Sequence, residues 1–199
     1  MPDFSIEKEV KSGGYKYVCG VDEAGRGPLA GPVSAAAVIL PDDIVIEGLN
    51  DSKKISEKKR EILFDIIKEK AISYSIAFAS IEEIEEHNIL NATFLAMSRA
   101  INGLDVKTDF ALIDGNRVPS GISVPCKTVV KGDSLSCSIA AASILANVSR
   151  DRYMCSLDSS YDVYNFKKHK GYGTKEHTDL IKKYGPSDIH RLSFLKNIL

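Results

Sequence analysis

Apolar residues in this chain fall into short runs separated by polar segments, a pattern typical of an α/β protein. The segment Ile72–Ser80 alternates larger apolar residues with small or polar ones, as a strand with one buried face does. Phe110–Gly115 is short, almost continuously apolar and ends at a carboxylate, which indicates a buried strand. The pattern predicts five strands, over residues 15–21, 31–40, 72–80, 110–115 and 124–130.

Helical spacing of apolar residues appears between and after these strands. Ser56 is expected to cap a helix whose apolar positions include Leu63 and Ile67. The sequence predicts further helices over residues 81–87, 89–102, 133–157, 174–184 and 189–199. We expect one domain over residues 1–199, with a loosely ordered terminus at 1–14 and a helical C-terminal region at 158–199.

Composition narrows the class of protein. The 199 residues are 44% hydrophobic and 27% charged with a net charge of −1, which is ordinary for a globular protein and excludes a uniformly basic nucleic-acid coat. Residues 150–199 nevertheless hold ten Lys or Arg against six Asp or Glu. The apolar run Ala35–Leu40 is too short to cross a bilayer, and no signal peptide is recognisable. We therefore expect a cytoplasmic protein with no membrane contact and four free cysteines.

The stretch Gly20–Val33 lies between two predicted strands and carries the most unusual chemistry. Asp22 and Glu23 stand side by side at the end of an apolar strand, followed by Gly25 and Gly27. Burying an unpaired carboxylate costs several kcal/mol or forces it to take a proton. A divalent cation would compensate these charges, and the glycines would allow another group to approach closely.

Two further acids stand at the ends of predicted elements. Asp114 ends an apolar strand, and Asp133 begins a helix rich in small residues. Taken singly, Asp114 is better explained by a turn and Asp133 by a helix N-cap. Together with Asp22 and Glu23 they form an oxygen-only ligand set that suits Mg²⁺ or Mn²⁺. Since successive strand residues point to opposite faces, Asp22 and Glu23 can serve one site only if the backbone bends there or if Glu23 also offers its carbonyl oxygen.

Four segments resemble, in the same order along the chain, the motifs of type 2 ribonuclease H, the ribonuclease HII family. They are Val21–Gly27, Leu112–Asn116, Lys131–Ser136 with Ile139–Ile144, and His169–Thr174. The resemblance implies an α/β ribonuclease H-like fold, in which helices flank a five-stranded mixed sheet and a helical C-terminal region follows.

The resemblance also implies an activity. Asp22, Glu23, Asp114 and Asp133 would be the catalytic ligands of two divalent cations, Mg²⁺ or Mn²⁺. The enzyme would hydrolyse the RNA strand of RNA–DNA hybrids and cut 5′ of single ribonucleotides embedded in duplex DNA. Its products would carry 3′-hydroxyl and 5′-phosphate ends, and we expect it to act as a monomer.

Five further residues match substrate-binding positions of the family. The backbone of Gly25, Arg26 and Gly27 is similar to the loop that senses the ribose 2′-hydroxyl, the group that distinguishes RNA from DNA. Tyr172 would pack beside the sugar at the RNA–DNA junction. Lys53 would lie in a loop that contacts phosphate.

The chain departs from the family pattern at two positions, and two other functions are conceivable. Asn147 stands where a lysine is expected, and Asp162 stands where a proline is expected. A dinucleotide-binding loop around Gly25 and Gly27 is disfavoured, because two carboxylates would lie beside the pyrophosphate. A non-catalytic nucleic-acid binding module is the second alternative. We expect His169 to lie in a loop facing nucleic acid, since lysines surround it.

Overall fold

A five-stranded mixed sheet forms the centre of the computed structural model, which describes residues 1–199. The strand order is β3-β2-β1-β4-β5. Strands β1, β4 and β5 are parallel, whereas β2 is antiparallel to both β1 and β3. This confirms the predicted sheet. The bounds are β1 Val18–Ala24, β2 Val33–Ile39, β3 Ser73–Ala79, β4 Phe110–Asp114 and β5 Cys126–Val129.

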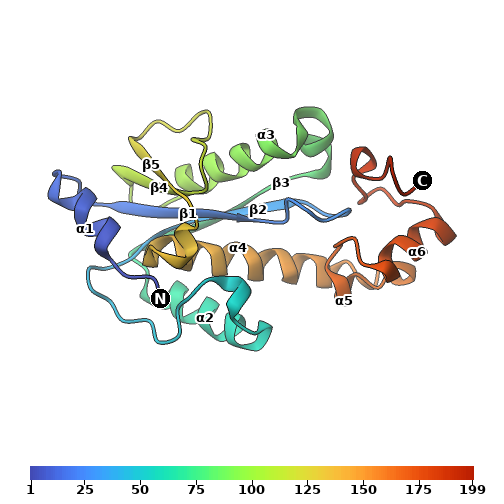
Figure 1. Cartoon of the computed structure of the whole chain (residues 1–199), viewed down its shortest axis with the longest axis horizontal. Helices are drawn as coiled ribbons and strands as arrows, with labels where there is room; N and C mark the ends of the chain where they lie inside the picture. The colour runs from blue at the N-terminus through green and yellow to red at the C-terminus, as the bar shows by residue number, and fades with distance from the viewer.

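Helices cover both faces of the sheet (Figure 1). Helix α3 (Ile81–Asn102) packs on one face, while α4 (Cys137–Ser156) and α2 (Glu57–Lys70) pack on the other. Asn88 interrupts α3 with a φ of 65°, at the position where two separate helices were predicted. The Ser56 side chain caps α2 as expected, by accepting the Lys59 N–H. Each face of the sheet has its own buried apolar cluster.

Helix α4 approaches the centre of the sheet unusually closely. Its first half is buried and rich in small residues, including Ala140, Ala141 and Ala142. On the opposing strand, a Cβ added to Gly20 would lie 2.1 Å from the Ser138 carbonyl carbon. A larger side chain at Gly20 would therefore push α4 away from β1, so the small residues set the depth at which α4 sits.

The N-terminus is ordered, contrary to the expectation of a loose segment over residues 1–14. Residues Ser5–Ser12 form helix α1, and Glu7 and Val10 on its inner face are buried. Glu7 accepts hydrogen bonds from the Ser136 hydroxyl (2.6 Å) and the Ser138 N–H (2.9 Å). The glycines that suggested disorder follow the helix and only end it, whereas Glu7 fixes α1 to the start of α4.

The long helix begins later than predicted, and this changes the environment of Asp133. Asp133 lies in a separate 3₁₀ turn, Gly132–Ser134, that precedes α4. Ser136 is the N-cap of α4, because its hydroxyl accepts the Ile139 N–H. The alternative interpretation of Asp133 as the cap of this helix is therefore wrong, and its carboxylate is free for other contacts.

The C-terminal region forms a separate end of the molecule (Figure 1). It contains α5 (Phe166–His169) and α6 (Lys175–Tyr184), and it packs around Met154 at the end of α4. The tail predicted to be helical over 189–199 forms only a 3₁₀ turn, Leu192–Phe194. All four cysteines are free thiols. No helix has the length and apolar character needed to span a membrane.

Candidate active site

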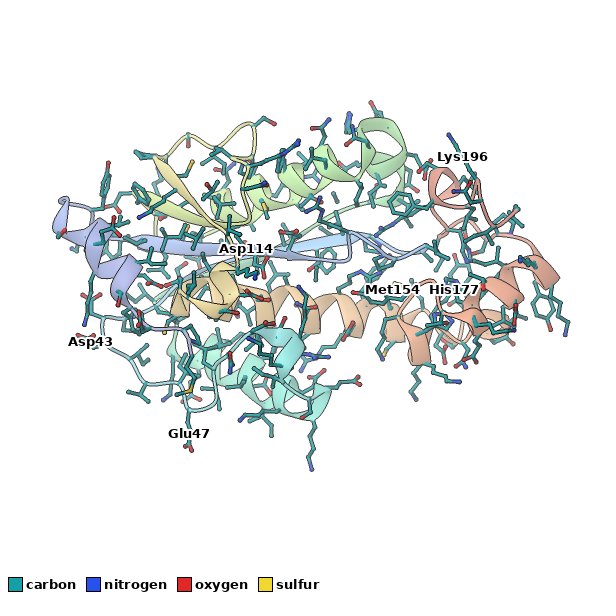
Figure 2. The ribbon with its side chains drawn as sticks, viewed as in Figure 1. Asp43, Glu47, Asp114, Met154, His177 and Lys196 are labelled. Atoms are coloured by element: carbon teal, nitrogen blue, oxygen red, sulfur yellow. The ribbon has the colours of Figure 1, made fainter.

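The carboxyl ends of two parallel strands bring the first acids together. Val21 of β1 is in register with Ile113 of β4, so Asp22 and Asp114 follow as neighbours at one edge of the sheet. Figure 2 shows Asp114 near the centre of the molecule, between the sheet and the start of α4. Parallel strands deliver their carboxyl ends to the same edge, and this edge is where α/β proteins commonly bind ligands.

A cleft of about 240 Å³ opens at this edge. Part of its wall is formed by Ser143 and Asn147 of α4, together with Ser52 and Ala24. All nine residues that the sequence singled out also line it: Asp22, Glu23, Gly25, Arg26, Gly27, Lys53, Asp114, Asp133 and Tyr172. The cleft therefore collects residues from five segments that lie far apart in the sequence.

Asp22 is the most deeply buried acid of the cleft, with 5% of its surface exposed. Burial, followed by the charges of Glu23 and Asp114, raises the pKa of Asp22 well above its usual range. Glu23 leaves the strand on the other side, where it also lines a neighbouring pocket against α3 with Met97. The opposite orientations expected of successive strand residues thus persist, and both carboxylates still reach the cleft because it lies at the edge of the sheet.

The carboxylate of Glu23 has a single cationic partner. Arg26 Nη1 lies 3.3 Å from Glu23 Oε1. Burial raises the pKa of Glu23 despite this contact, and the nearby Asp114 charge acts in the same direction. One half-exposed arginine therefore leaves most of the negative charge of the cleft uncompensated.

Asp114 and Asp133 are held on the far wall by the turn that precedes α4. Asp114 Oδ1 accepts the Gly132 N–H at 2.6 Å, which fixes the turn carrying Asp133 against the end of β4. Burial raises the pKa of Asp133, and the neighbouring charges of Asp51 and Asp114 raise it further. Asp51 is thus an additional acid close to Asp133, and sequence reasoning placed it only in a phosphate-contacting loop.

The chemistry of this donor set fits a divalent cation. Four carboxylates meet here with little positive charge nearby, and the raised pKa values of Asp22, Glu23 and Asp133 indicate that a hard cation would stabilise the site. No three His, Cys, Asp or Glu side chains already meet closely enough to hold an ion alone. The acids therefore line an open site, and Mg²⁺ commonly keeps several water ligands when carboxylates bind it.

A polar network on α4 supports the loop that carries Lys53. The Ser52 hydroxyl lies 3.0 Å from the Ser143 hydroxyl, and Asn147 Nδ2 donates to Ser52 Oγ at 3.2 Å. The Asp51 side chain accepts the Lys53 N–H at 2.9 Å. Asn147, at the position where a lysine was expected, thus contributes a hydrogen bond to this loop.

Tyr172 borders the cleft from the C-terminal region and is 45% exposed. Its ring lies over the guanidinium of Arg150, at 5.5 Å. Its backbone carbonyl accepts a hydrogen bond from His177 Nδ1 at 2.9 Å. The main chain beside it is joined to the glycine-rich loop, because the Leu29 N–H donates to the Gly171 carbonyl at 2.8 Å.

His169 is buried, contrary to the expectation of an exposed loop residue, although it also borders a pocket that Lys53 and Tyr172 line. It is 7% exposed and stacks on His177, with ring centroids 4.2 Å apart. Its Nε2 lies 2.7 Å from the Tyr164 carbonyl, and its Nδ1 accepts the Gly171 N–H. Lys167 and Lys168 misled the sequence interpretation, since both lysines are exposed while the imidazole packs inward.

Comparison with known proteins identifies the family of this chain. The family model described as ribonuclease HII matches residues 19–197. A ribonuclease HII of Caldicellulosiruptor saccharolyticus is 57% identical over 98% of this chain and 95% of its own length. That of Clostridioides difficile is also 57% identical, over 98% of this chain and 76% of its own length. This chain belongs to the ribonuclease HII family.

Solved structures of this family and its relatives share the fold. The crystal structure of ribonuclease H2 from Pyrococcus horikoshii is 25% identical, with a TM-score of 0.76, and the match covers 92% of this chain and 97% of that one. A structure titled as the complex of PCNA and ribonuclease HII from Archaeoglobus fulgidus is 24% identical, with a TM-score of 0.71 over 89% and 94% of the two chains. The predicted ribonuclease H-like fold is confirmed, and the dinucleotide-binding alternative is excluded.

Proposed function

We propose that this ribonuclease H cuts on the 5′ side of single ribonucleotides embedded in duplex DNA, in addition to its general activity. Family membership supplies that general activity: the chain is a divalent-metal-dependent enzyme that hydrolyses the RNA of RNA–DNA hybrids. The proposed products carry 3′-hydroxyl and 5′-phosphate ends. The observation that carries the proposal is the cleft in which four acids face the backbone of Gly25–Gly27 and the ring of Tyr172.

The four acids would hold the cations. Asp22, Glu23, Asp114 and Asp133 supply only carboxylate oxygens, and their shared cleft has room for oxygen ligands from substrate. When bound, two such ions would supply an activated water and neutralise charge on the leaving oxygen of a phosphodiester. We propose Mg²⁺ or Mn²⁺ in this role.

The remaining residues would select and orient the substrate. Unpaired N–H groups at Arg26 and Gly27 are suited to a ribose hydroxyl, and the exposed ring of Tyr172 offers an apolar face for the adjacent sugar. Lys53 and Lys170, together with Arg60, line a second pocket of about 390 Å³ beside Tyr172. Such cations provide sequence-independent contacts to a phosphate backbone.

The decisive experiment is cleavage of a labelled DNA duplex that contains one ribonucleotide. The reaction is run with Mg²⁺, with Mn²⁺ and with EDTA, next to an RNA–DNA hybrid and an all-DNA duplex. We expect a metal-dependent cut 5′ of the lone ribonucleotide. Cleavage of the hybrid alone would remove the single-ribonucleotide activity. Binding of the duplexes without any cleavage would favour the non-catalytic module.

A further inference from the structure

Two arginines are buried next to the glycine-rich loop without any acidic partner. Arg150 is 1% exposed and Arg191 is fully buried, and neither forms an ion pair. Removing a guanidinium from water is costly unless its N–H groups are hydrogen-bonded. Both arginines donate hydrogen bonds only to backbone carbonyls. These bonds offset the cost of removing each guanidinium from water, and they hold the main chain in one conformation.

Arg191 concentrates its hydrogen bonds on a single short loop. It comes from the C-terminal region and donates to four carbonyls within seven residues of one another. The acceptors are the carbonyl oxygens of Gly25 (2.7 Å), Arg26 (3.1 Å), Pro28 (2.9 Å) and Gly31 (2.8 Å). The planar fork of a guanidinium can satisfy several acceptors in fixed directions, whereas a lysine ammonium cannot reproduce that geometry.

The inward carbonyls determine where the neighbouring N–H groups point. In a trans peptide the C=O and the following N–H point in opposite directions, and the chain has no cis peptide bond. Because the Gly25 and Arg26 carbonyls turn toward Arg191, the N–H groups of Arg26 and Gly27 turn away from it. Neither N–H has an acceptor within the protein, and both residues line the acid cleft.

Arg150 secures the other end of the same loop. Its side chain donates to the carbonyls of Ala30 (3.0 Å), Pro32 (3.1 Å) and Lys170 (3.0 Å), so it joins the loop to the segment carrying Tyr172. Gly25 has a φ of 94°, and a Cβ added there would lie 2.1 Å from Arg150 Nε. The loop is thus fixed from two sides by side chains that do not reach the cleft.

We propose that Arg191 is a positioning residue for ribonucleotide selectivity, holding the Gly25–Gly31 carbonyls inward so that the Arg26 and Gly27 N–H groups face the ribose 2′-oxygen. This inference rests on the proposed function of the cleft. Arg191 itself touches no substrate. Its removal should therefore reduce discrimination between ribose and deoxyribose more than it reduces binding to nucleic acid in general.

The test compares the Asp22→Asn variant with the double variant Asp22→Asn, Arg191→Lys. Both carry Asp22→Asn so that bound substrate is not cut. Dissociation constants are measured with Mg²⁺ for a DNA duplex containing one ribonucleotide and for the matched all-DNA duplex. We expect the ratio of the two constants to fall by about tenfold, the size of effect that one lost hydrogen bond produces. Binding of the all-DNA duplex should change little. An unchanged ratio in a folded variant would overturn the proposal.

Two controls separate the possible failures. Arg99→Lys alters an arginine that pairs with Glu83 on α3, and it should leave the ratio unchanged. Wild-type cleavage of the single-ribonucleotide duplex is measured in parallel. If the wild type does not cut it, the proposed function fails; if it cuts while the ratio is insensitive to Arg191, only the positioning role fails.

A second measurement decides the matter if Arg191→Lys does not fold. Backbone amide resonances of Arg26 and Gly27 are followed by NMR in the Asp22→Asn chain during titration with each duplex. The proposal expects larger shifts of these two amides with the ribonucleotide duplex than with the all-DNA duplex. Equal shifts with both duplexes would contradict it.

Discussion

At the scale of single residues, the cleft depends on carboxylates that a cation would stabilise. Asp22→Asn keeps the shape of the most buried acid but removes its charge, so we expect cleavage of an RNA–DNA hybrid to fall by about a thousandfold or more. Substrate binding should be largely retained. Steady-state cleavage and a binding isotherm test both statements. Asp42→Asn, on an exposed acid paired with Lys11, is the matched control. Substantial activity in Asp22→Asn would remove the two-metal account.

Tyr172 offers a second test at this scale. We expect Tyr172→Ala to lower the preference for the RNA–DNA junction by about tenfold, since stacking on an aromatic ring contributes about 1–3 kcal/mol. Tyr172→Phe should retain the preference, because it keeps the ring. Cleavage-site mapping on a chimeric strand with one RNA–DNA junction measures the effect. Equal junction preference in the alanine variant would exclude the proposed packing role.

Individual residues also mark the limit of what the sequence could predict. Asp22, Glu23 and Asp114 could be found because each carboxylate stands at the end of an apolar run, where a charge needs an explanation. Arg150 and Arg191 could not, because they look like ordinary charged residues of a basic C-terminal region. Their burial depends on carbonyls that lie more than a hundred residues away in the chain, and no local pattern records such contacts.

At the scale of elements, the close contact between β1 and α4 determines the stability of the cleft. Gly20→Ala would place a Cβ 2.1 Å from the Ser138 carbonyl carbon, so the helix must shift. We expect a loss of about 1–3 kcal/mol, which corresponds to a fall in Tm of roughly 3–10 °C. Thermal unfolding measures it. Gly27→Ala is the control for stability, since no atom lies within 4 Å of its added Cβ.

Element types were easier to predict than element ends. The five strands were foreseen because their apolar runs are short and clearly bounded, and Ser56 was recognisable as a cap. The start of α4 was placed three to four residues early, because Asp133 and Ser136 are both residues that cap helices. Asp133 does not cap the helix because Asp114 accepts the Gly132 N–H, and this tertiary contact holds Gly132–Ser134 in a separate 3₁₀ turn.

At the scale of the whole molecule, three buried histidines of the C-terminal region make the stability of the fold depend on pH. His190 Nδ1 accepts the Ser187 N–H, so its Nε2 carries the proton and donates to His177 Nε2 at 3.1 Å. His177 Nδ1 therefore donates to the Tyr172 carbonyl. Burial lowers the pKa of both His177 and His190 to about 4, and it also lowers the pKa of His169.

These shifts predict a loss of stability in mild acid. In the unfolded chain, His177 and His190 take up protons near pH 6.5, whereas in the folded chain they remain neutral until about pH 4. The contribution of these histidines to the free energy of unfolding should thus be complete above pH 6.5 and should decrease as the pH falls toward 4. The slope is about 1.4 kcal/mol per pH unit for each proton of difference. Urea unfolding between pH 7.5 and 4.5 measures it.

Variants isolate the histidine contribution from that of the acids. His177→Gln should be less stable at neutral pH but should lose less stability on acidification than the wild type. His87→Gln alters an exposed histidine and should leave the pH dependence unchanged. If His177→Gln and the wild type lose stability in parallel, the buried cluster does not control the acid response.

The contacts of Arg191 have a consequence for how the enzyme is made. Arg191 donates hydrogen bonds to carbonyls up to 166 positions earlier in the chain, whereas all four acids lie within residues 22–133. Because translation proceeds from the N-terminus, a nascent chain holds the complete set of acids well before it contains the arginine that orients the glycine-rich loop. On the proposed role of Arg191, discrimination between ribose and deoxyribose is thus acquired only after all four acids have been synthesised.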